Sequence, residues 1–215
     1  QFTDEKVRQA FACSLDRKQI VDTIGRGVIP FERNGGVSQT TPGYSEKADD
    51  WDSQDMKKAD ALLDAAGRKR KGSTGVREKD GVRASFPLLY PADDSLRQGL
   101  ALAVADMVEP AGLEVVPEGV SGEEIDARLH SDPVVFGWGS HDPTEMYNLY
   151  HSSRAGDEYF NAGLYASEAV DRHLDAAMRA TDQDEANASW RAAQLDAQGE
   201  GFTAPADAAW AWLVN

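Results

Sequence analysis

The feature that most constrains the fold is an alternation of short apolar runs and helical patterns between residues 85 and 138. Apolar runs lie at Ser85–Tyr90, Leu113–Val116 and Val134–Phe136, and a segment with helical spacing separates each pair. Short continuous apolar runs are typical of strands in the interior of a parallel sheet. The order β-α-β-α-β therefore predicts an α/β fold with three parallel strands joined by right-handed crossovers.

Capping residues support both helices of this unit. Asp93 or Asp94 precedes the first helix, and Ser121 with Glu124 three residues later forms a capping box for the second. The residues expected to face inward are Leu96, Leu100, Ala103, Val104, Met107 and Val108 in the first helix and Ile125 and Leu129 in the second.

The part of the chain before this unit reads as helices joined by irregular segments. A helix starts near Thr3, and the chain is capped again at Asp16. Residues 28–52 lack a period and read as a long loop, which is either functional or covers a helix edge. Asp52 or Ser53 caps the next helix, which ends at Gly67. The basic stretch Arg68–Lys79 reads as a solvated loop, with a phosphate site as the lesser alternative.

The part after residue 145 is predicted to be mostly helical. Ser167 and Asp182 are the expected caps of two helices, and Ala208–Val214 is an apolar extended run. The expected inward residues of these helices are Val170, Leu174, Ala177 and Met178, then Ala186, Trp190, Ala193 and Ala197.

Composition argues against several classes of protein. The 215 residues suit one domain or two small ones, and the net charge of −15 disfavours binding to nucleic acid or to an anionic membrane. No apolar stretch is long enough to span a membrane. The single cysteine, Cys13, lies in a helical pattern and is expected to be a buried apolar residue. The chain starts at Gln1 without Met, so we expect it to be a piece of a longer protein.

A candidate site lies between the third predicted strand and the next helix. Asp142 is the expected N-cap of that helix, with Pro143 in its first turn and Glu145 closing a capping box. Ligands of open α/β sheets bind outside the carboxyl ends of strands. The expected ligand-binding residues are Trp138, Gly139, Ser140, His141 and Asp142. A packed Trp138 in an ordinary turn is the equally weighted alternative.

The residues that catalysis or metal binding would need are not arranged for either. Ser140, His141 and Asp142 are adjacent in sequence and cannot converge as a hydrolytic triad. His130, His151 and His173 read as surface helix residues, and no pair has the spacing of a helical zinc site. We therefore expect no catalytic residue, no metal site and no cofactor, and favour a binding protein over an enzyme.

Five sequence blocks follow one another along nearly the whole chain: Phe2–Phe11 with Leu15–Arg17 and Ile20–Val21; Lys57–Gly67; Asp80–Arg83 before a strand; Gly137–Trp138 followed by Asp142–Pro143; and Tyr165, Val170–Asp171 and Ala180–Asp182. In this order they resemble the family 5 extracellular solute-binding proteins of ABC transporters. This family includes oligopeptide, dipeptide and nickel binders.

The resemblance implies one lobe of a type II periplasmic-binding-protein-like fold. Residues 1–215 would form the second lobe, with the first lobe absent from this chain. The full protein would capture a peptide, a nickel or other metal chelate, or another small solute between its lobes and deliver it to ABC permease subunits. It would be extracytoplasmic and lipid-anchored. A solute-sensing domain of a transcription regulator is the alternative.

One residue departs from the pattern of the peptide binders. In those proteins an Asp three residues after the Trp holds the amino terminus of the peptide, and here that position is His141. Asp142 could take over that role, but it is also the expected helix cap. His141 would equally suit a metal chelate or a solute that carries a carboxylate.

Overall fold

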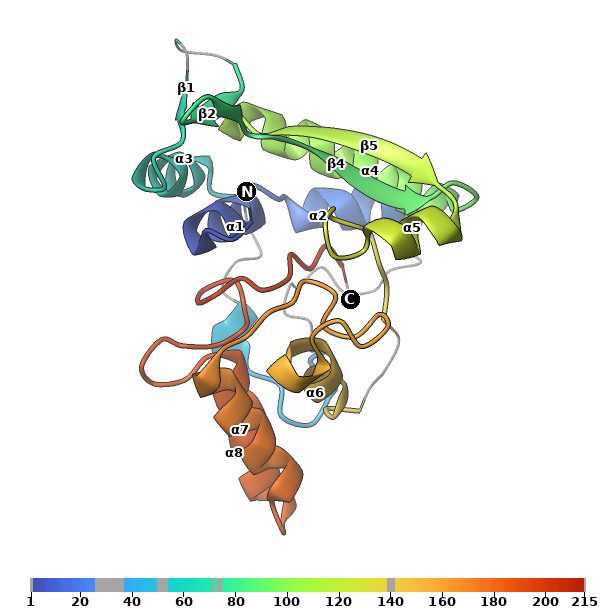
Figure 1. The fold of residues 1–215 in the computed structure, drawn as a ribbon. Helices are drawn as coiled ribbons and strands as arrows, with labels where there is room; N and C mark the ends of the chain where they lie inside the picture. The colour runs from blue at the N-terminus through green and yellow to red at the C-terminus, as the bar shows by residue number, and fades with distance from the viewer. Residues whose placement is uncertain are drawn as a thin grey trace.

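The computed structural model describes residues 2–25, 37–49, 54–70, 72, 75–138 and 142–214. Figure 1 shows a sheet with its helices in the upper part and a helical part below, with the C-terminus between them. Each part surrounds its own hydrophobic core. Among the described residues, no helix combines the length and the apolar character that crossing a membrane requires.

The parallel β-α-β unit forms as the sequence predicts. Strands β4 (Ser85–Pro91) and β5 (Glu114–Val120) pair in parallel along their whole length, in a register that starts at Ser85 and Glu114. Helix α4 (Ser95–Val108) and the 3₁₀ turn η3 (Glu109–Ala111) connect them. Strand β5 runs on through Pro117 instead of ending at Val116.

The third predicted strand is reduced to a single parallel bridge. Helix α5 (Gly122–Arg128) leads back to β4, where Val134 pairs with Leu89. Leu89 donates its N–H to Pro133 O at 2.9 Å, and Val135 donates to Leu89 O at 2.8 Å. The predicted direction is correct, but a strand over Val134–Phe136 is wrong. The chain leaves the sheet after Val135, and the ring of Phe136 packs on other aromatic rings.

Most predicted helix caps are confirmed. The side chains of these predicted caps each accept a backbone N–H three residues later: Asp16 for α2 (Arg17–Ile20), Asp94 for α4, Ser121 for α5, Ser167 for α7 (Glu168–Arg179) and Asp182 for α8 (Gln183–Gln194). Two helices have caps that were not predicted: Asp4 for α1 (Glu5–Cys13) and Asp55 for α3 (Met56–Ala65). Asp4 replaces the expected Thr3. Asp52 and Ser53 lie outside the described residues, and Asp55 caps that helix. A π-helical turn, η1 (Val21–Gly25), follows α2, and a 3₁₀ turn, η2 (Glu46–Asp49), precedes α3.

The basic stretch Arg68–Lys79 is part of an antiparallel sheet, so the prediction of a solvated loop is wrong. Its strands are β1 (Lys69–Arg70), β2 (Arg77–Lys79) and β3 (Val82–Arg83). Arg77 is buried, and its guanidinium donates to Asp60 at 2.6 Å and to Asp64 at 2.8 Å. These ion pairs hold the hairpin against α3.

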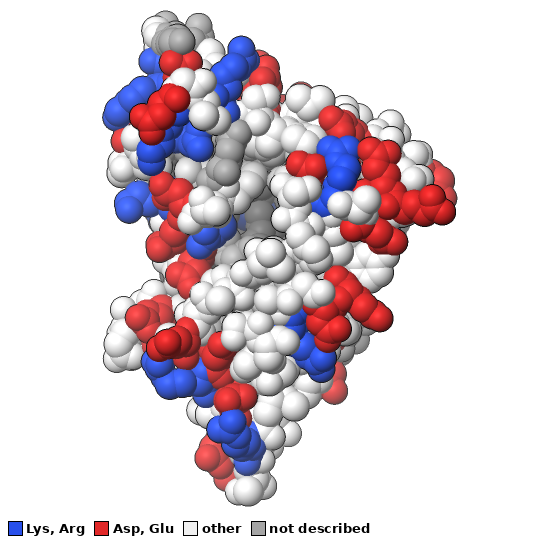
Figure 2. All heavy atoms as spheres, in the orientation of Figure 1, with Lys and Arg blue, Asp and Glu red and all other residues white. Residues whose placement is uncertain are grey.

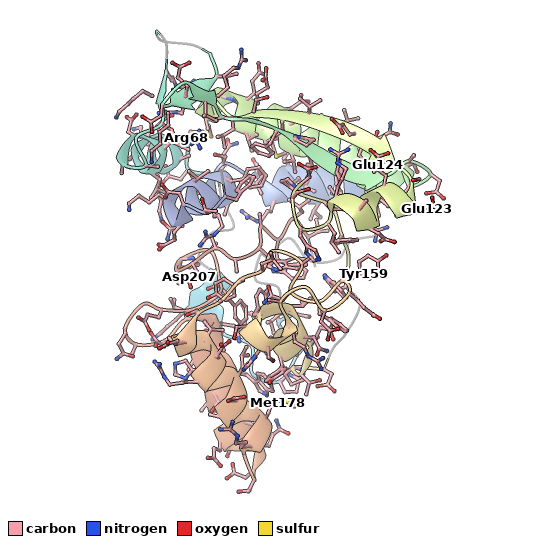
Figure 3. The ribbon with its side chains drawn as sticks, in the orientation of Figure 1. Arg68, Glu123, Glu124, Tyr159, Met178 and Asp207 are labelled. Carbon is pink, nitrogen blue, oxygen red and sulfur yellow. The ribbon has the colours of Figure 1, made fainter. Side chains whose placement is uncertain are left out.

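The second core lies among α6 (Glu145–Tyr150), α7 and α8, with Val37 and Phe202 added from other segments. The 3₁₀ turn η4 (Ser152–Arg154) follows α6. Helices α7 and α8 form a hairpin that projects from the lower part (Figure 1). Leu174 is fully buried, but Met178, labelled on this hairpin in Figure 3, is 51% exposed. The prediction that Met178 faces inward is wrong, and so is that for Leu96, which is 49% exposed. Ala197 was also expected to face inward, but it is exposed and lies beyond the end of α8.

An extended segment near the C-terminus lies between the two cores. In this segment, which we call the C-terminal strap (residues 209–214), Ala211 and Leu213 pack against the first core and Trp210 and Trp212 against the second. Successive side chains of an extended chain point to opposite sides, which explains this division from Trp210 to Leu213. At the two ends of the strap the alternation stops, because Ala209 also packs against the second core and Val214 against the first. The strap pairs with no strand in the described part of the chain.

Candidate functional site

The structure describes two of the five predicted site residues. Trp138 and Asp142 are described, whereas Gly139, Ser140 and His141 lie outside the described residues. The expected roles of these three residues therefore stay predictions.

Asp142 closes a turn ahead of helix α6. Its carboxylate accepts the N–H of Thr144 at 2.9 Å, and its carbonyl accepts the N–H of Glu145 at 3.0 Å. The helix starts at Glu145, with Thr144 in the N-cap position. The prediction that Asp142 is the N-cap and Pro143 the first helical residue is therefore wrong by two residues. An aspartate that accepts the N–H two residues on forms an Asx turn, which competes locally with the start of a helix.

Trp138 lies in a group of aromatic rings from three separate segments. Its ring is stacked on Phe160, with centroids 5.9 Å apart and an interplanar angle of 21°. Trp210 contacts it edge-on at 6.3 Å, and Phe136 lies at 6.4 Å. Two more rings extend this group: Tyr159 contacts Phe136, and Trp212 stacks on Trp210. We call the six rings the aromatic cluster: Phe136, Trp138, Tyr159, Phe160, Trp210 and Trp212.

The two ends of the aromatic cluster differ in environment. At one end, Trp212 stacks on Trp210 and donates its indole N–H to Tyr150 Oη at 2.8 Å. Tyr150 is fully buried, and this burial raises the pKa of its phenol. At the other end, Tyr159 is 42% exposed and lies between the upper and lower parts in Figure 3. Its hydroxyl donates to Asp126, and this hydrogen bond raises the pKa of Tyr159.

The other five residues of the aromatic cluster are partly buried, so several of them, and not Tyr159 alone, contribute to the protein surface. Such contiguous aromatic surface marks sites where a protein takes up ligands or partners. Sequence reasoning selected Trp138 but missed Phe160, Trp210 and Trp212. The alternation of Trp210 and Trp212 in an extended run was a usable signal, because it places both rings on one side.

The cations beside the aromatic cluster are already paired. Arg97, which approaches Gly137, forms an ion pair with Asp94, whose pKa is lowered by the N–H of Arg97 and by its guanidinium. Arg154 lies 5.8 Å from the centre of the Phe160 ring and pairs with Asp157 at 2.8 Å. In Figure 2, most of the described atoms near the centre of the face shown belong neither to Lys or Arg nor to Asp or Glu. The described part of the site therefore offers rings rather than free charge.

Two histidines differ from the prediction of a surface helix residue: His130 is exposed but lies in a turn after α5, and His151 is buried. The ring of His151 stacks on Tyr147, and its Nδ1 accepts the N–H of Ser153 at 3.0 Å. His130 contacts Ala162 O, and His173 lies 3.3 Å from Asp196. Within the described ranges, no three His, Cys, Asp or Glu side chains are placed to hold a metal ion.

Comparison with known proteins assigns this chain to a family. Residues 1–160 match the family described as bacterial extracellular solute-binding proteins, family 5, middle. The chain therefore belongs to the family 5 extracellular solute-binding proteins. Its relatives in this family are solute-binding proteins and not enzymes.

Individual relatives agree with this assignment. The chain is 39% identical over 195 residues to protein XP55 of Streptomyces lividans, which covers 89% of this chain and 35% of that protein. It is similar to the oligopeptide-binding protein AppA of Bacillus subtilis, solved with a nonapeptide, with a TM-score of 0.79 and 25% identity. The match covers 99% of this chain and 42% of AppA. It is also similar to NikZ of Campylobacter jejuni, solved with Ni(L-His), with a TM-score of 0.77 and 26% identity. This match covers 88% of this chain and 38% of NikZ.

These matches confirm the predicted mixed α/β, periplasmic-binding-protein-like fold. The chain spans about two fifths or less of the length of these relatives.

Proposed function

We propose that this chain is part of the substrate-binding component of an ABC importer, which captures an extracytoplasmic solute in a cleft between two lobes. Residues 1–215 form one lobe of that protein, and a first lobe elsewhere in the polypeptide supplies the other wall. The solute is a short peptide, a nickel or other metal chelate, or another small molecule. The partners are that first lobe and the permease subunits of the importer, and the whole protein is lipid-anchored outside the cytoplasm.

The observation that carries this proposal is the family match over residues 1–160. The aromatic cluster supports it, because Trp138, Trp210 and Trp212 present partly buried rings beside the second core and the cations beside the cluster are paired with carboxylates. Binding sites for small molecules are mostly apolar and aromatic, with a few placed polar groups. The site residues of the proposal are Trp138, Gly139, Ser140, His141 and Asp142.

Calorimetry on the full-length protein tests the proposal. The two probes are a nonapeptide and the nickel–histidine complex, the ligands with which AppA and NikZ were solved. We expect the full-length protein to bind one of them. Residues 1–215 alone should bind the same probe much more weakly, because a site that closes between two lobes keeps only half of its contacts. Equally tight binding by residues 1–215 would contradict the two-lobed site.

A Trp138→Ala variant tests the role of the aromatic cluster in the same assay. Truncation of an aromatic anchor typically costs about 2 kcal/mol or more of binding free energy. We therefore expect the affinity of the full-length variant to fall by roughly thirtyfold or more. An unchanged affinity together with a lower melting temperature would show that Trp138 is purely structural.

A further inference from the structure

The indole N–H of Trp138 is a buried donor without a partner. Its Nε1 atom is inaccessible to solvent and has no hydrogen-bond acceptor in the described protein. Burying an N–H without an acceptor costs free energy, and most buried polar groups in folded proteins are paired. An unpaired donor at this position therefore needs an explanation.

A second tryptophan of the aromatic cluster shows the usual arrangement. The indole N–H of Trp212 is satisfied by Tyr150 Oη at 2.8 Å. The two tryptophans are linked through Trp210, which contacts both rings. The same cluster thus contains one indole N–H with an internal acceptor and one without.

The surroundings of Trp138 favour a donor role for the edge of its ring over a stacking role for its face. One face of the indole already packs on Phe160, and Trp210 contacts the ring edge-on. The backbone of Phe136, Gly137 and Trp138 makes no hydrogen bond to the described protein. Trp138 as a whole is only partly buried and Gly137 is exposed, so this segment lies at the surface although the Nε1 atom does not. Donation to a solute requires a shift of the segment that exposes the N–H, and such a shift would break no backbone hydrogen bond to the described protein.

We propose that Trp138 is a specificity-determining residue that donates its indole N–H to an oxygen acceptor of the bound solute. The acceptor is a carbonyl or carboxylate oxygen, which a peptide and a metal-bound amino acid both carry. The inference rests on the proposed function, because the solute must reach this site. The protein would then select solutes that place an acceptor oxygen at the N–H edge of the Trp138 ring.

The variant Trp138→Phe isolates the N–H, because it keeps an aromatic ring and removes the donor. We expect the full-length Trp138→Phe protein to bind its probe, the nonapeptide or the nickel–histidine complex, about tenfold more weakly than the wild type. The matched control is Trp212→Phe, which removes an N–H that already donates to Tyr150 Oη within the protein. This control should lower the melting temperature and weaken binding less than Trp138→Phe does.

The two probes distinguish the source of the oxygen, a peptide carbonyl or an amino-acid carboxylate. An unchanged affinity of Trp138→Phe for the probe that the wild type binds would overturn the inference and leave the proposed function intact. A wild-type protein that binds neither probe would instead contradict the proposed function in this form. The unfolding comparison without solute then decides the inference: if Trp138→Phe is destabilised as much as Trp212→Phe, the N–H of Trp138 has an internal acceptor and the inference is wrong.

Discussion

The guanidinium of Arg77 joins several elements of the first core. Besides Asp60 and Asp64 on α3, it donates to Arg68 O at 2.7 Å and to Ala111 O at 2.8 Å. Only 3% of Arg77 is exposed, so these bonds replace most of its contact with water. Arg77→Met keeps much of the side-chain volume but leaves these acceptors unpaired. We expect it to lower the free energy of unfolding by about 3 kcal/mol, measured by urea denaturation.

Acid denaturation tests the same residue in a second way. Burial raises the pKa of Asp60, but hydrogen bonds from Arg77 and Arg70 outweigh this and lower it, and the hydrogen bond from Arg77 lowers the pKa of Asp64. A carboxyl group with a lowered folded-state pKa stabilises the protein above its unfolded-state pKa of about 3.9, and this stabilisation is lost as the pH falls further. Stability measured below about pH 4 should therefore fall less steeply in Arg77→Met than in the wild type. Parallel curves would contradict this assignment.

His141 gives a prediction about binding rather than stability. If this residue meets the solute, affinity should change between about pH 5 and 8, where histidine titrates. Acid should weaken the binding of a metal that a neutral imidazole ligates, and should strengthen the binding of a carboxylate that an imidazolium pairs with. Affinity of the full-length protein measured across this range, beside His141→Gln, distinguishes the two. A variant that keeps both the affinity and its pH profile would show that His141 takes no part.

Helix α7 illustrates at the scale of an element what periodicity predicts well and what it does not. Val170, Leu174 and Ala177 form its buried stripe, and Met178 lies one step further around the helix and is half-exposed. Leu174→Ala should lower the free energy of unfolding by about 2–5 kcal/mol, because it leaves a cavity. The matched variant Met178→Ala should cost about 0.5 kcal/mol or less. Equal losses in thermal denaturation would contradict the described placement of this helix.

Local signals were sufficient for the helix caps and for the parallel pair β4 and β5. Asp94, Ser121 and Asp182 act through hydrogen bonds to residues three positions away, so the sequence around them contains the whole interaction. Whether Val134–Phe136 forms a strand depends instead on how many backbone hydrogen bonds it can make to β4 and on the aromatic rings that contact Phe136. Those partners lie far away in the sequence, and periodicity does not report on them.

The basic stretch and the aromatic cluster were missed for the same reason. The buried guanidinium of Arg77 is satisfied by Asp60 and Asp64 on α3 and by the carbonyls of Arg68 and Ala111. A basic, glycine-rich stretch by itself indicates solvent exposure. Trp138 was selected from its place at the end of an apolar run, but its neighbours Phe160 and Trp210 come from distant segments. The sequence therefore pointed to Trp138 alone, whereas the rings around it depend on contacts between distant segments; the location of the binding site stays a prediction.

At the scale of the whole molecule, the N-terminal helices hold the end of the chain through its backbone carbonyls. Arg17 is fully buried and donates to Trp212 O at 2.8 Å and to Ala12 O at 3.0 Å. Arg8 donates to Asp207 O at 2.9 Å, and Gln9 donates to Ala206 O at 2.5 Å. Tyr165 of the lower part donates to the carboxylate of Asp207 at 2.5 Å, and Asp207 lies between the two parts in Figure 3. The C-terminal strap and the residues before it therefore contact both parts.

This arrangement predicts that Arg17 couples the two cores. Arg17→Met keeps an unbranched side chain in the core but removes the hydrogen bonds to Trp212 and Ala12, which should cost about 3 kcal/mol of unfolding free energy. For a chain of this size the melting temperature should fall by roughly 6–12 °C. Because the strap carries Trp210 and Trp212, hydrogen exchange should rise in residues 206–214 and in the aromatic cluster more than in β4 and β5. The control Arg172→Met, at an exposed position on α7, should leave both measurements unchanged. Exchange that rises uniformly across both cores would mean that Arg17 supports overall stability alone and does not hold the strap between them.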